Sequence, residues 1–314
     1  MLSHLSGVPG LRILENVPLS RFTRFAIGGE ARMLVDASSE EALAGAMAAL
    51  REARSPHALI GGGTNLIASD QGFPGAVLRF TSSRIEFDGC RVTVDAGALL
   101  QDLVNASIER GLEGLETMTG IPGWVGGAVY GNAGAYGHSI QERIDWVRFF
   151  DGDKFREIGN AACGFRYRES VFKIHKDWVI VAAGLRLTPS DGGTLKATAE
   201  GILEIRNRKY PPEMRCAGSI FKNLILAELP PAVREQVPCS VIREGKAPSA
   251  YFLEQAGAKG MASGGIRVAD YHANLIYNSD SGTACQVIEM IETLRQRVQE
   301  RFGIELEEEV QRLG

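Results

Sequence analysis

The sequence predicts a chain of mixed helices and strands folded into two or three domains. At 314 residues the chain is long for a single hydrophobic core. Apolar residues recur at helical spacing over 99–110 and 283–302, and the second stretch is followed by Gly303, which predicts where that helix stops. Residues 144–187 contain short apolar runs and a turn signal, a pattern typical of antiparallel strands.

The composition excludes several classes of protein. Hydrophobic residues make up 45% and charged residues 23%, which is ordinary for a globular chain. The net charge of −4 argues against a nucleic-acid binder, and no apolar run approaches the length of a membrane helix. We expect no secretion signal, because no basic region precedes an apolar core at the amino terminus. Five scattered cysteines without a CxxC pair predict reduced thiols in the cytoplasm, and the dispersed histidines argue against a metal centre.

The remaining elements are predicted from local signals. Ser38 and Glu41 have the spacing of a capping box, which would open a helix through about Arg51. Short apolar runs predict strands at 31–35, 76–80, 91–95, 147–150, 178–182, 185–187 and 273–277, and further helices at 197–208 and 252–257.

Two glycine-rich loops are candidates for binding a cofactor. The apolar run Ala58–Ile60 leads into three glycines, which permit positive φ and an anion-binding nest of N–H groups, although a plain tight turn has the same composition. Residues 120–137 hold seven glycines and Pro122, a composition that we expect to exclude an ordinary helix or strand interior. Two such loops suggest a dinucleotide. Neither loop matches the GxGxxG fingerprint, so a Rossmann site is not supported.

Polar residues gather in two further stretches. Ser219 follows Ala217-Gly218, where the missing Cβ of Gly218 lets a ligand approach, and Lys222 and Asn223 come next. A turn entering a strand is the alternative interpretation. Residues 167–173 cluster donors between strands, and a solvated hairpin edge would look the same.

Six segments in order resemble the UDP-N-acetylenolpyruvoylglucosamine reductase family, and the resemblance covers residues 23–314. The segments are Ile60–Leu66, Gly120–Gly137 with its Gly-Ile-Pro-Gly start, Tyr167–Ser170, Ala217–Asn223, Ala256–Gly260 and Leu306–Val310. The short stretch between Arg168 and Ser219 is similar to the subtype that lacks a tyrosine-bearing capping loop.

The resemblance implies an α+β fold of three domains. Two of them form an FAD-binding module of the vanillyl-alcohol-oxidase (PCMH) type, at 1–80 (joined by the tail 304–314) and 81–208, and the third, at 209–303, binds substrate. The glycine loops contain no histidine or cysteine, so we expect the FAD to be non-covalent. The implied cofactor residues are Gly61, Gly62, Gly63, Thr64, Asn65, Leu66, Gly120, Ile121, Pro122, Gly123, Gly126, Gly127, Asn132, Ala133, Gly134 and Ala135.

The resemblance also implies the chemistry. NADPH reduces FAD and leaves, flavin N5 delivers hydride to C3 of the enolpyruvyl group, and a proton arrives at C2. Arg168 matches the arginine that holds the carboxylate, Ser219 the proton donor, and Glu309 a glutamate that helps if protonated or linked by water. The implied substrate contacts are Tyr167, Lys209, Asn223 and His272. We expect a cytoplasmic monomer acting in peptidoglycan precursor synthesis on a small UDP-sugar, without metal, nucleic acid or membrane.

Three departures from the family pattern stay open: Glu169 replaces an aspartate, Trp124 replaces a small residue beside the expected flavin, and the segment 224–248 is long. Trp124 would either stack on the flavin or narrow its pocket. Two other hypotheses compete. One is a flavin-linked oxidase or dehydrogenase of another alcohol. The other is a flavin-binding protein without turnover, in which Trp124 blocks the nicotinamide.

Overall fold

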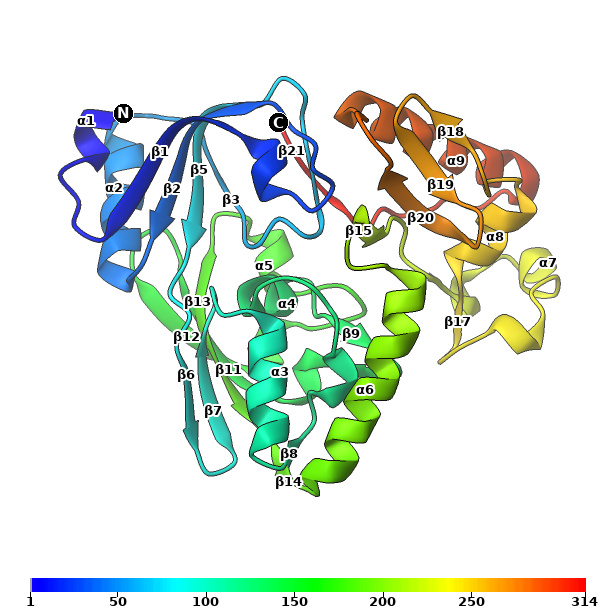
Figure 1. Cartoon of the computed structure of the whole chain (residues 1–314), viewed down its shortest axis with the longest axis horizontal. Coiled ribbons are helices and arrows are strands. Elements are labelled where there is room, and N and C mark those ends of the chain that lie inside the picture. The colour runs from blue at the N-terminus through cyan, green and yellow to red at the C-terminus, as the bar shows by residue number, and fades with distance from the viewer. Residues whose placement is uncertain (1) are drawn as a thin grey trace. The chain divides into compact units, whose positions relative to one another are not determined.

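The computed structural model describes residues 2–314, and Figure 1 gives the order of the elements along the chain. The chain divides into two compact units, each assembled from segments that are far apart in the sequence. The first unit comprises residues 2–17, 31–62 and 73–208, and the second comprises residues 18–30, 63–72 and 209–314. The finer division into three domains stays a prediction.

The first sheet of the first unit has four strands. The order β1-β2-β5-β3 places β2 and β3 parallel to β5. The helix α2 and the short α1 belong to the same part of the chain, at the blue end of Figure 1. The bounds are β1 Leu11–Pro18, β2 Glu30–Ala37, β3 His57–Leu59, β5 Phe73–Phe80, α1 Leu2–Leu5 and α2 Glu40–Glu52.

The predicted capping box at the start of α2 is wrong by one residue. Ser39 is the N-cap, and its Oγ accepts a hydrogen bond from the backbone N–H of Ala42 at 3.1 Å. The hydroxyl of Ser38 instead donates to the carbonyl of Gly10 at 3.0 Å, so it is not available to cap the helix.

The second sheet of the first unit is antiparallel, as predicted, with the order β12-β11-β13-β7-β6. The two strands predicted at 178–182 and 185–187 form one strand, β13. Gly184 lies within this strand. It has to be glycine because a Cβ there would lie only 2.1 Å from Nε1 of Trp146. The bounds are β6 Ile85–Asp88, β7 Arg91–Asp95, β11 Ile144–Phe150, β12 Phe155–Gly159 and β13 Val179–Arg186.

Helices and short ladders complete the first unit. They are α3 Leu100–Glu109, α4 Val125–Tyr130, α5 Val171–Ile174 and α6 Gly192–Lys209, with β8 Leu112–Glu113 paired to β14 Thr188–Pro189 and β9 Gly134–Ala135 paired to β10 His138–Ser139. The helix α6 begins five residues before its predicted start, and Figure 1 shows it as a long straight helix.

The helix α4 contradicts the expectation that residues 120–137 exclude helix. Its glycines allow close packing, since a Cβ on Gly126 would lie 2.9 Å from the Cβ of Ala96. The N–H of Gly126 also donates to the carbonyl of Ala96 at 2.8 Å. Packing therefore compensates for the poor helix propensity of glycine.

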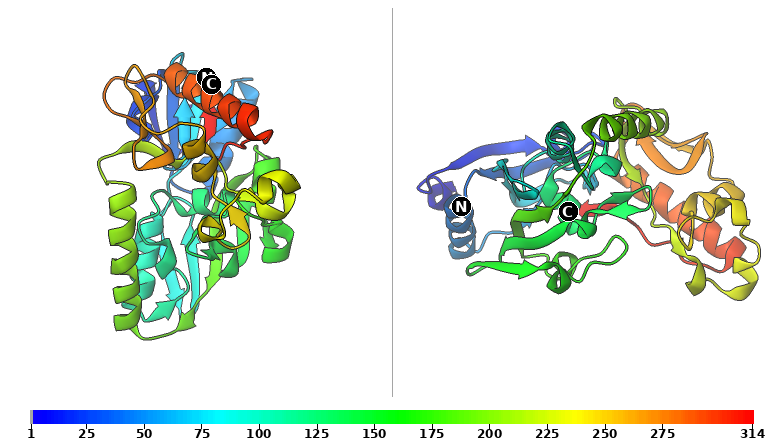
Figure 2. Two further views of the ribbon diagram at one scale, coloured as in Figure 1. Left: turned by 90° about the vertical axis from the view of Figure 1, so that its right-hand side faces the viewer. Right: turned by 90° about the horizontal axis from the view of Figure 1, so that it is seen from below.

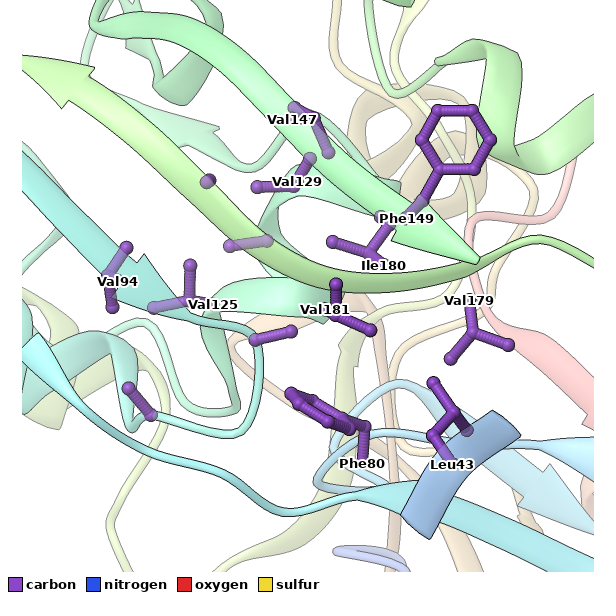
Figure 3. Close-up of a cluster of buried hydrophobic side chains, with 14 of the residues drawn as sticks. Leu43, Phe80, Val94, Val125, Val129, Val147, Phe149, Val179, Ile180 and Val181 are labelled. Atoms are coloured by element: carbon purple, nitrogen blue, oxygen red, sulfur yellow. The ribbon is translucent and has the colours of Figure 1, made fainter. Parts of the chain in front are cut away.

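Figure 3 shows part of the buried core of the first unit. The side chains come from α2, β5, β7, α4, β11 and β13, so both sheets and two helices contribute to it. The labelled residues are Leu43, Phe80, Val94, Val125, Val129, Val147, Phe149, Val179, Ile180 and Val181. This core fixes the base of α4, which carries the second glycine loop.

The second unit contains an antiparallel sheet in the order β15-β20-β19-β18. The helix α9 runs behind this sheet in the view of Figure 1, and Figure 2 shows it from two other sides. The bounds are β15 Arg215–Ser219, β18 Ala262–Ser263, β19 Ile266–Ala269, β20 His272–Asn278, α8 Ser249–Gln255 and α9 Ala284–Phe302.

The predicted end signals of α9 are confirmed. Thr283 is the N-cap and forms a capping box with Gln286, while Gly303 takes a left-handed conformation with φ 66°. The predicted apolar face is buried except at Phe302, which packs against the core of the unit.

The long segment 224–248 closes as a hairpin-like excursion. The strands β16 Leu224–Ile225 and β17 Lys246–Ala247 pair at its base, with α7 Pro231–Arg234 between them. Leu229, Val233 and Val237 are buried in the core of the second unit, so this segment belongs to the folded structure.

A parallel pair joins β4 Leu66–Ala68 to β21 Gln311–Leu313. The last strand thereby lies beside the residues that follow the first glycine loop.

Candidate flavin and substrate site

The first glycine loop leaves room above its backbone. A Cβ at Gly61 would meet no protein atom within 4 Å. Gly63 has φ +64°, and a Cβ there would lie 1.8 Å from the carbonyl oxygen of Phe22. The carbonyl of Phe22 therefore excludes any side chain at position 63. The open space at Gly61 would let a ligand approach the backbone closely.

The second glycine loop has the same property at Gly127. This residue is exposed on α4, and a Cβ there would meet nothing within 4 Å. Gly120 and Gly123 adopt positive φ, at 76° and 118°, which other residues rarely adopt. Because neither packing nor φ explains the missing side chain at Gly127, the loop fits a large ligand lying against its backbone.

Trp124 connects the two loops within the first unit. A Cβ on Gly62 would lie 3.2 Å from Cδ1 of the indole. The guanidinium of Arg79 lies 5.4 Å from the centroid of the indole, and Arg79 is paired with the buried Asp36 at 2.6 Å. The indole is partly buried against protein, so the departure at Trp124 has a structural role.

Asn132 anchors the end of the second loop. It is 2% exposed and has φ 43°. Its amide donates to the carbonyl of Arg166 at 2.9 Å and to Oε1 of Gln141 at 3.1 Å. The amide therefore ties this loop to the turn that bears Arg168.

Arg168 is held in a strained turn. Its φ of 58° is unusual for a residue with a side chain. Arg166 and Glu169 exchange backbone hydrogen bonds at 3.1 and 3.0 Å, which closes the turn. The Arg168 guanidinium donates to the carbonyl of Gly134 at 3.0 Å and lies 5.3 Å from the ring centroid of Tyr167.

Two further contacts fix this turn. Lys173 Nζ donates to the carbonyl of Arg168 at 2.6 Å, and it lies 3.5 Å from a carboxylate oxygen of Glu169. The buried Ser170 hydroxyl donates to the carbonyl of Tyr130 at 2.7 Å. Glu169 thus pairs with a lysine near the same turn.

In the second unit, Ser219 ends β15 just after a bulge. The register with β20 shifts between Cys216 and Ser219, and Gly218 has φ +75°. A Cβ at Gly218 would meet nothing within 4 Å. Ser219 Oγ lies 3.1 Å from the hydroxyl of Tyr210. The bulge therefore places the open space at Gly218 directly before the residue that carries the serine hydroxyl.

The structure brings Glu309 to the residues that follow β15. Its N–H donates to the carbonyl of Ile220 at 2.7 Å, and the N–H of Lys222 donates to the carbonyl of Glu307 at 2.9 Å. The amide of Asn65 donates to the carbonyl of Glu309 at 3.0 Å. Ser219, Glu309 and Asn65, which are distant in the sequence, are therefore neighbours in the second unit.

Glu308 fixes the segment that carries Glu309. Its carboxylate accepts from Arg295 and from Arg312, in the latter case at 2.6 and 3.0 Å. The carboxylate is largely buried, so the network holds this segment in place more firmly than an exposed ion pair would.

Sequence reasoning missed Asn274, a buried residue within β20. Its Oδ1 accepts from the N–H of Phe221 at 2.9 Å, and its amide donates to the carbonyl of the same residue at 2.8 Å. The signal was an asparagine flanked by apolar residues inside a strand, a position where an amide needs polar partners.

His272 is the first residue of β20, and its ring is hydrogen-bonded to the same strand. Its Nδ1 accepts from the N–H of Asn274 at 3.1 Å. Burial, and then the nearby Lys209 ammonium, lowers the pKa of His272 to about 4. The ring is therefore neutral near pH 7. Asn223 Oδ1 accepts from the N–H of Ser249 at 3.4 Å.

Within residues 2–314, no group of three histidine, cysteine or acidic side chains could hold a metal ion. Over the same residues, no helix is long and apolar enough to cross a membrane.

The cofactor class follows from the first comparison. A family model described as an FAD binding domain matches residues 31–154, a range that contains both glycine loops. With the open backbone at Gly61 and Gly127, this match identifies the chain as an FAD-binding oxidoreductase.

The particular family follows from four further matches. A model of the UDP-N-acetylenolpyruvoylglucosamine reductase C-terminal domain matches residues 210–313. A reductase of that name from Solibacter usitatus is 56% identical over 99% of both chains, and one from Rubrobacter xylanophilus is 36% identical over 95% of this chain and 94% of that one. The crystal structure of the Thermus caldophilus reductase is similar with a TM-score of 0.76 and 28% identity, and covers 97% of this chain and 100% of that one. The chain belongs to the UDP-N-acetylenolpyruvoylglucosamine reductase family.

The predicted fold class, FAD and a role in peptidoglycan precursor synthesis are confirmed by these matches.

Proposed function

We propose that this chain reduces UDP-N-acetylenolpyruvoylglucosamine to UDP-N-acetylmuramate with NADPH. The observation that carries the proposal is the bulge at Gly218, directly before Ser219, together with the backbone hydrogen bond that joins Glu309 to the next residue, Ile220, in a chain of this family. When bound, the FAD takes up hydride from NADPH and supplies it to C3 of the enolpyruvyl group. The residues of the chain have to bind the substrate, stabilise the negative charge and add a proton at C2.

Ser219 is the proposed acid. Adding hydride at C3 places negative charge on C2 and the adjoining carboxylate. A serine hydroxyl is a weak acid, but a carbanion is basic enough to take its proton when the two groups are in place. Gly218 keeps the approach to Ser219 open, because it carries no side chain.

Arg168 and Glu309 are the proposed stabilisers of charge. We assign the guanidinium of Arg168 to the substrate carboxylate, where a fixed cation would favour the charged transition state. The strained turn and the contact with Gly134 support this role, since they hold the side chain before substrate arrives. Glu309 acts if it is protonated or linked through water.

Lys209 is proposed to contact the diphosphate of the substrate. The rest of the substrate is proposed to contact Tyr167, Asn223 and His272. Because Nδ1 accepts from Asn274, a neutral His272 carries its proton on Nε2, which can donate one hydrogen bond to the substrate without adding charge. The described cysteines are all free thiols, which agrees with the proposal of a cytoplasmic enzyme. We treat the active form as a monomer.

The experiment is an anaerobic titration followed at the flavin absorbance band. NADPH should bleach the band, and UDP-N-acetylenolpyruvoylglucosamine should then restore it. Bleaching without recovery would remove the substrate from the proposal, and rapid oxygen consumption with other alcohols would favour the oxidase hypothesis. No bleaching at all would favour flavin binding without turnover.

A substitution at Ser219 tests its role as the acid without disturbing FAD binding. Ser219→Ala should bind FAD normally and be bleached normally, but recover about 100-fold more slowly or worse, the range of a lost general acid. Recovery at the normal rate in this variant would remove Ser219 from its role.

A further inference from the structure

Tyr210 is a second hydroxyl at Ser219. Its oxygen lies 3.1 Å from Ser219 Oγ, at hydrogen-bonding distance, and both side chains are partly buried. Tyr210 is the first residue after α6, and its ring packs against the small buried cluster of Cys216, Ala269 and Leu275. Packing against this cluster fixes the ring, and the hydroxyl of the ring contacts the serine.

A serine hydroxyl has one proton to donate and can accept hydrogen bonds on its lone pairs. If Ser219 donated to Tyr210, its proton would point away from the substrate. If Tyr210 donates instead, the single proton of Ser219 stays available for C2. Only the second arrangement is compatible with Ser219 as the acid.

We propose that Tyr210 positions Ser219 and stabilises the alkoxide that the proton transfer leaves. This inference rests on the proposed function of Ser219. The O–H bond of Ser219 breaks as the C2–H bond forms, and the electron pair of the broken bond stays on the serine oxygen. The hydroxyl of Tyr210 donates to that oxygen, which charge makes a stronger acceptor than a neutral hydroxyl.

The same contact restores the serine. A phenol is a stronger acid than an alkyl alcohol, so the proton of Tyr210 can pass to the alkoxide. The ammonium of Lys209 lies 5.0 Å from the centroid of the Tyr210 ring. A solvent proton then returns to the phenolate, so one proton from water is consumed for each product.

The test measures recovery of the flavin absorbance after substrate is mixed with the NADPH-bleached protein. Tyr210→Phe should slow this recovery about tenfold, with the FAD dissociation constant and the rate of bleaching unchanged. The solvent deuterium isotope effect on recovery should be larger in Tyr210→Phe than in the unaltered protein, because proton transfer then limits the rate more. A purely structural role for Tyr210 would leave the isotope effect unchanged.

Two further variants complete the test. Tyr277→Phe removes a hydroxyl from a ring packed against the same cluster, and should recover at the normal rate. Ser219→Ala combined with Tyr210→Phe should recover no more slowly than Ser219→Ala alone, since Tyr210 acts through Ser219.

The outcomes separate the two proposals. Recovery at the normal rate in Ser219→Ala would overturn the role of Ser219 itself. A slow Ser219→Ala variant with a normal Tyr210→Phe variant would overturn only the role of Tyr210. Equal slowing by Tyr210→Phe with and without Ser219 would show that Tyr210 acts independently, and would also overturn the inference.

Discussion

The indole of Trp124 lies against the backbone of Gly62, so that a single added carbon on Gly62 would be 3.2 Å from the indole Cδ1. One residue from each glycine loop therefore fixes the position of the other. Trp124 carries the largest side chain available, and Gly62 provides the room for it.

Gly62→Ala should weaken FAD binding about tenfold. The added methyl would push the indole away and move the second loop with it. In a Trp124→Leu background the same substitution should cost less, because the methyl then meets a smaller neighbour. Titration of the apoprotein with FAD, followed by flavin fluorescence, measures all four affinities. Additive losses in affinity would show that the two loops are not coupled through this contact.

Gly127→Ala should stabilise the apoprotein but weaken FAD binding. In the cofactor-free chain, alanine in a helix is favoured over glycine by about 0.5–1 kcal/mol, and no protein atom obstructs the methyl. The free energy of unfolding of the apoprotein should rise while the affinity for FAD falls.

The matched control for Gly127→Ala is Gly201→Ala in α6, a helix position with the same open surroundings outside the glycine loops. It should stabilise the apoprotein without changing FAD binding. Unchanged FAD affinity in Gly127→Ala would mean that α4 does not approach the cofactor.

At Arg168, glycine should be tolerated better than alanine. Both substitutions remove the guanidinium, so their difference isolates the backbone. Glycine normally destabilises relative to alanine, but at φ 58° the order should reverse, with Gly more stable by about 1 kcal/mol. Urea unfolding of the two variants measures the difference. Both should recover slowly with substrate; an alanine variant as stable as the glycine variant would argue against strain at this turn.

Acid should destabilise the protein partly through His272. The folded pKa of about 4 lies below the ordinary value of 6.5, so the unfolded chain takes up the proton first as pH falls. The stabilisation is complete above pH 6.5 and is lost between pH 6.5 and 4, up to about 3 kcal/mol.

His272→Asn retains an acceptor near the N–H of Asn274 but cannot take up this proton. Urea midpoints measured from pH 7 to pH 4 should fall less steeply in the variant than in the unaltered protein. Parallel curves would assign the acid sensitivity to other groups.

Local signals predicted much of the fold, because the physics that they report is local. The caps of α9, the strand at 91–95 and the antiparallel region after Ile144 each follow from residues adjacent in the sequence. The helix α4 was missed because one of its glycines, Gly126, is explained by contact with Ala96, which no local pattern contains.

The candidate site was predictable only as separate segments. The resemblance named Ser219 and Glu309, but the backbone bond between Glu309 and Ile220 joins residues that no local rule can pair. Tyr210 and Asn274 were not assigned these roles for the same reason: each acts through a partner whose position is set by tertiary packing.

The second unit has a consequence for synthesis of the chain. The amide of Asn278 donates to the carbonyl of Phe25, 253 positions earlier, at 3.1 Å. Phe25 and Ile27 belong to a core made mostly of residues after 216. During translation their side chains therefore stay exposed to solvent until most of the chain has been synthesised. At about 5–20 residues per second, this interval lasts on the order of ten seconds or more. During translation the early apolar residues are therefore natural targets for chaperones.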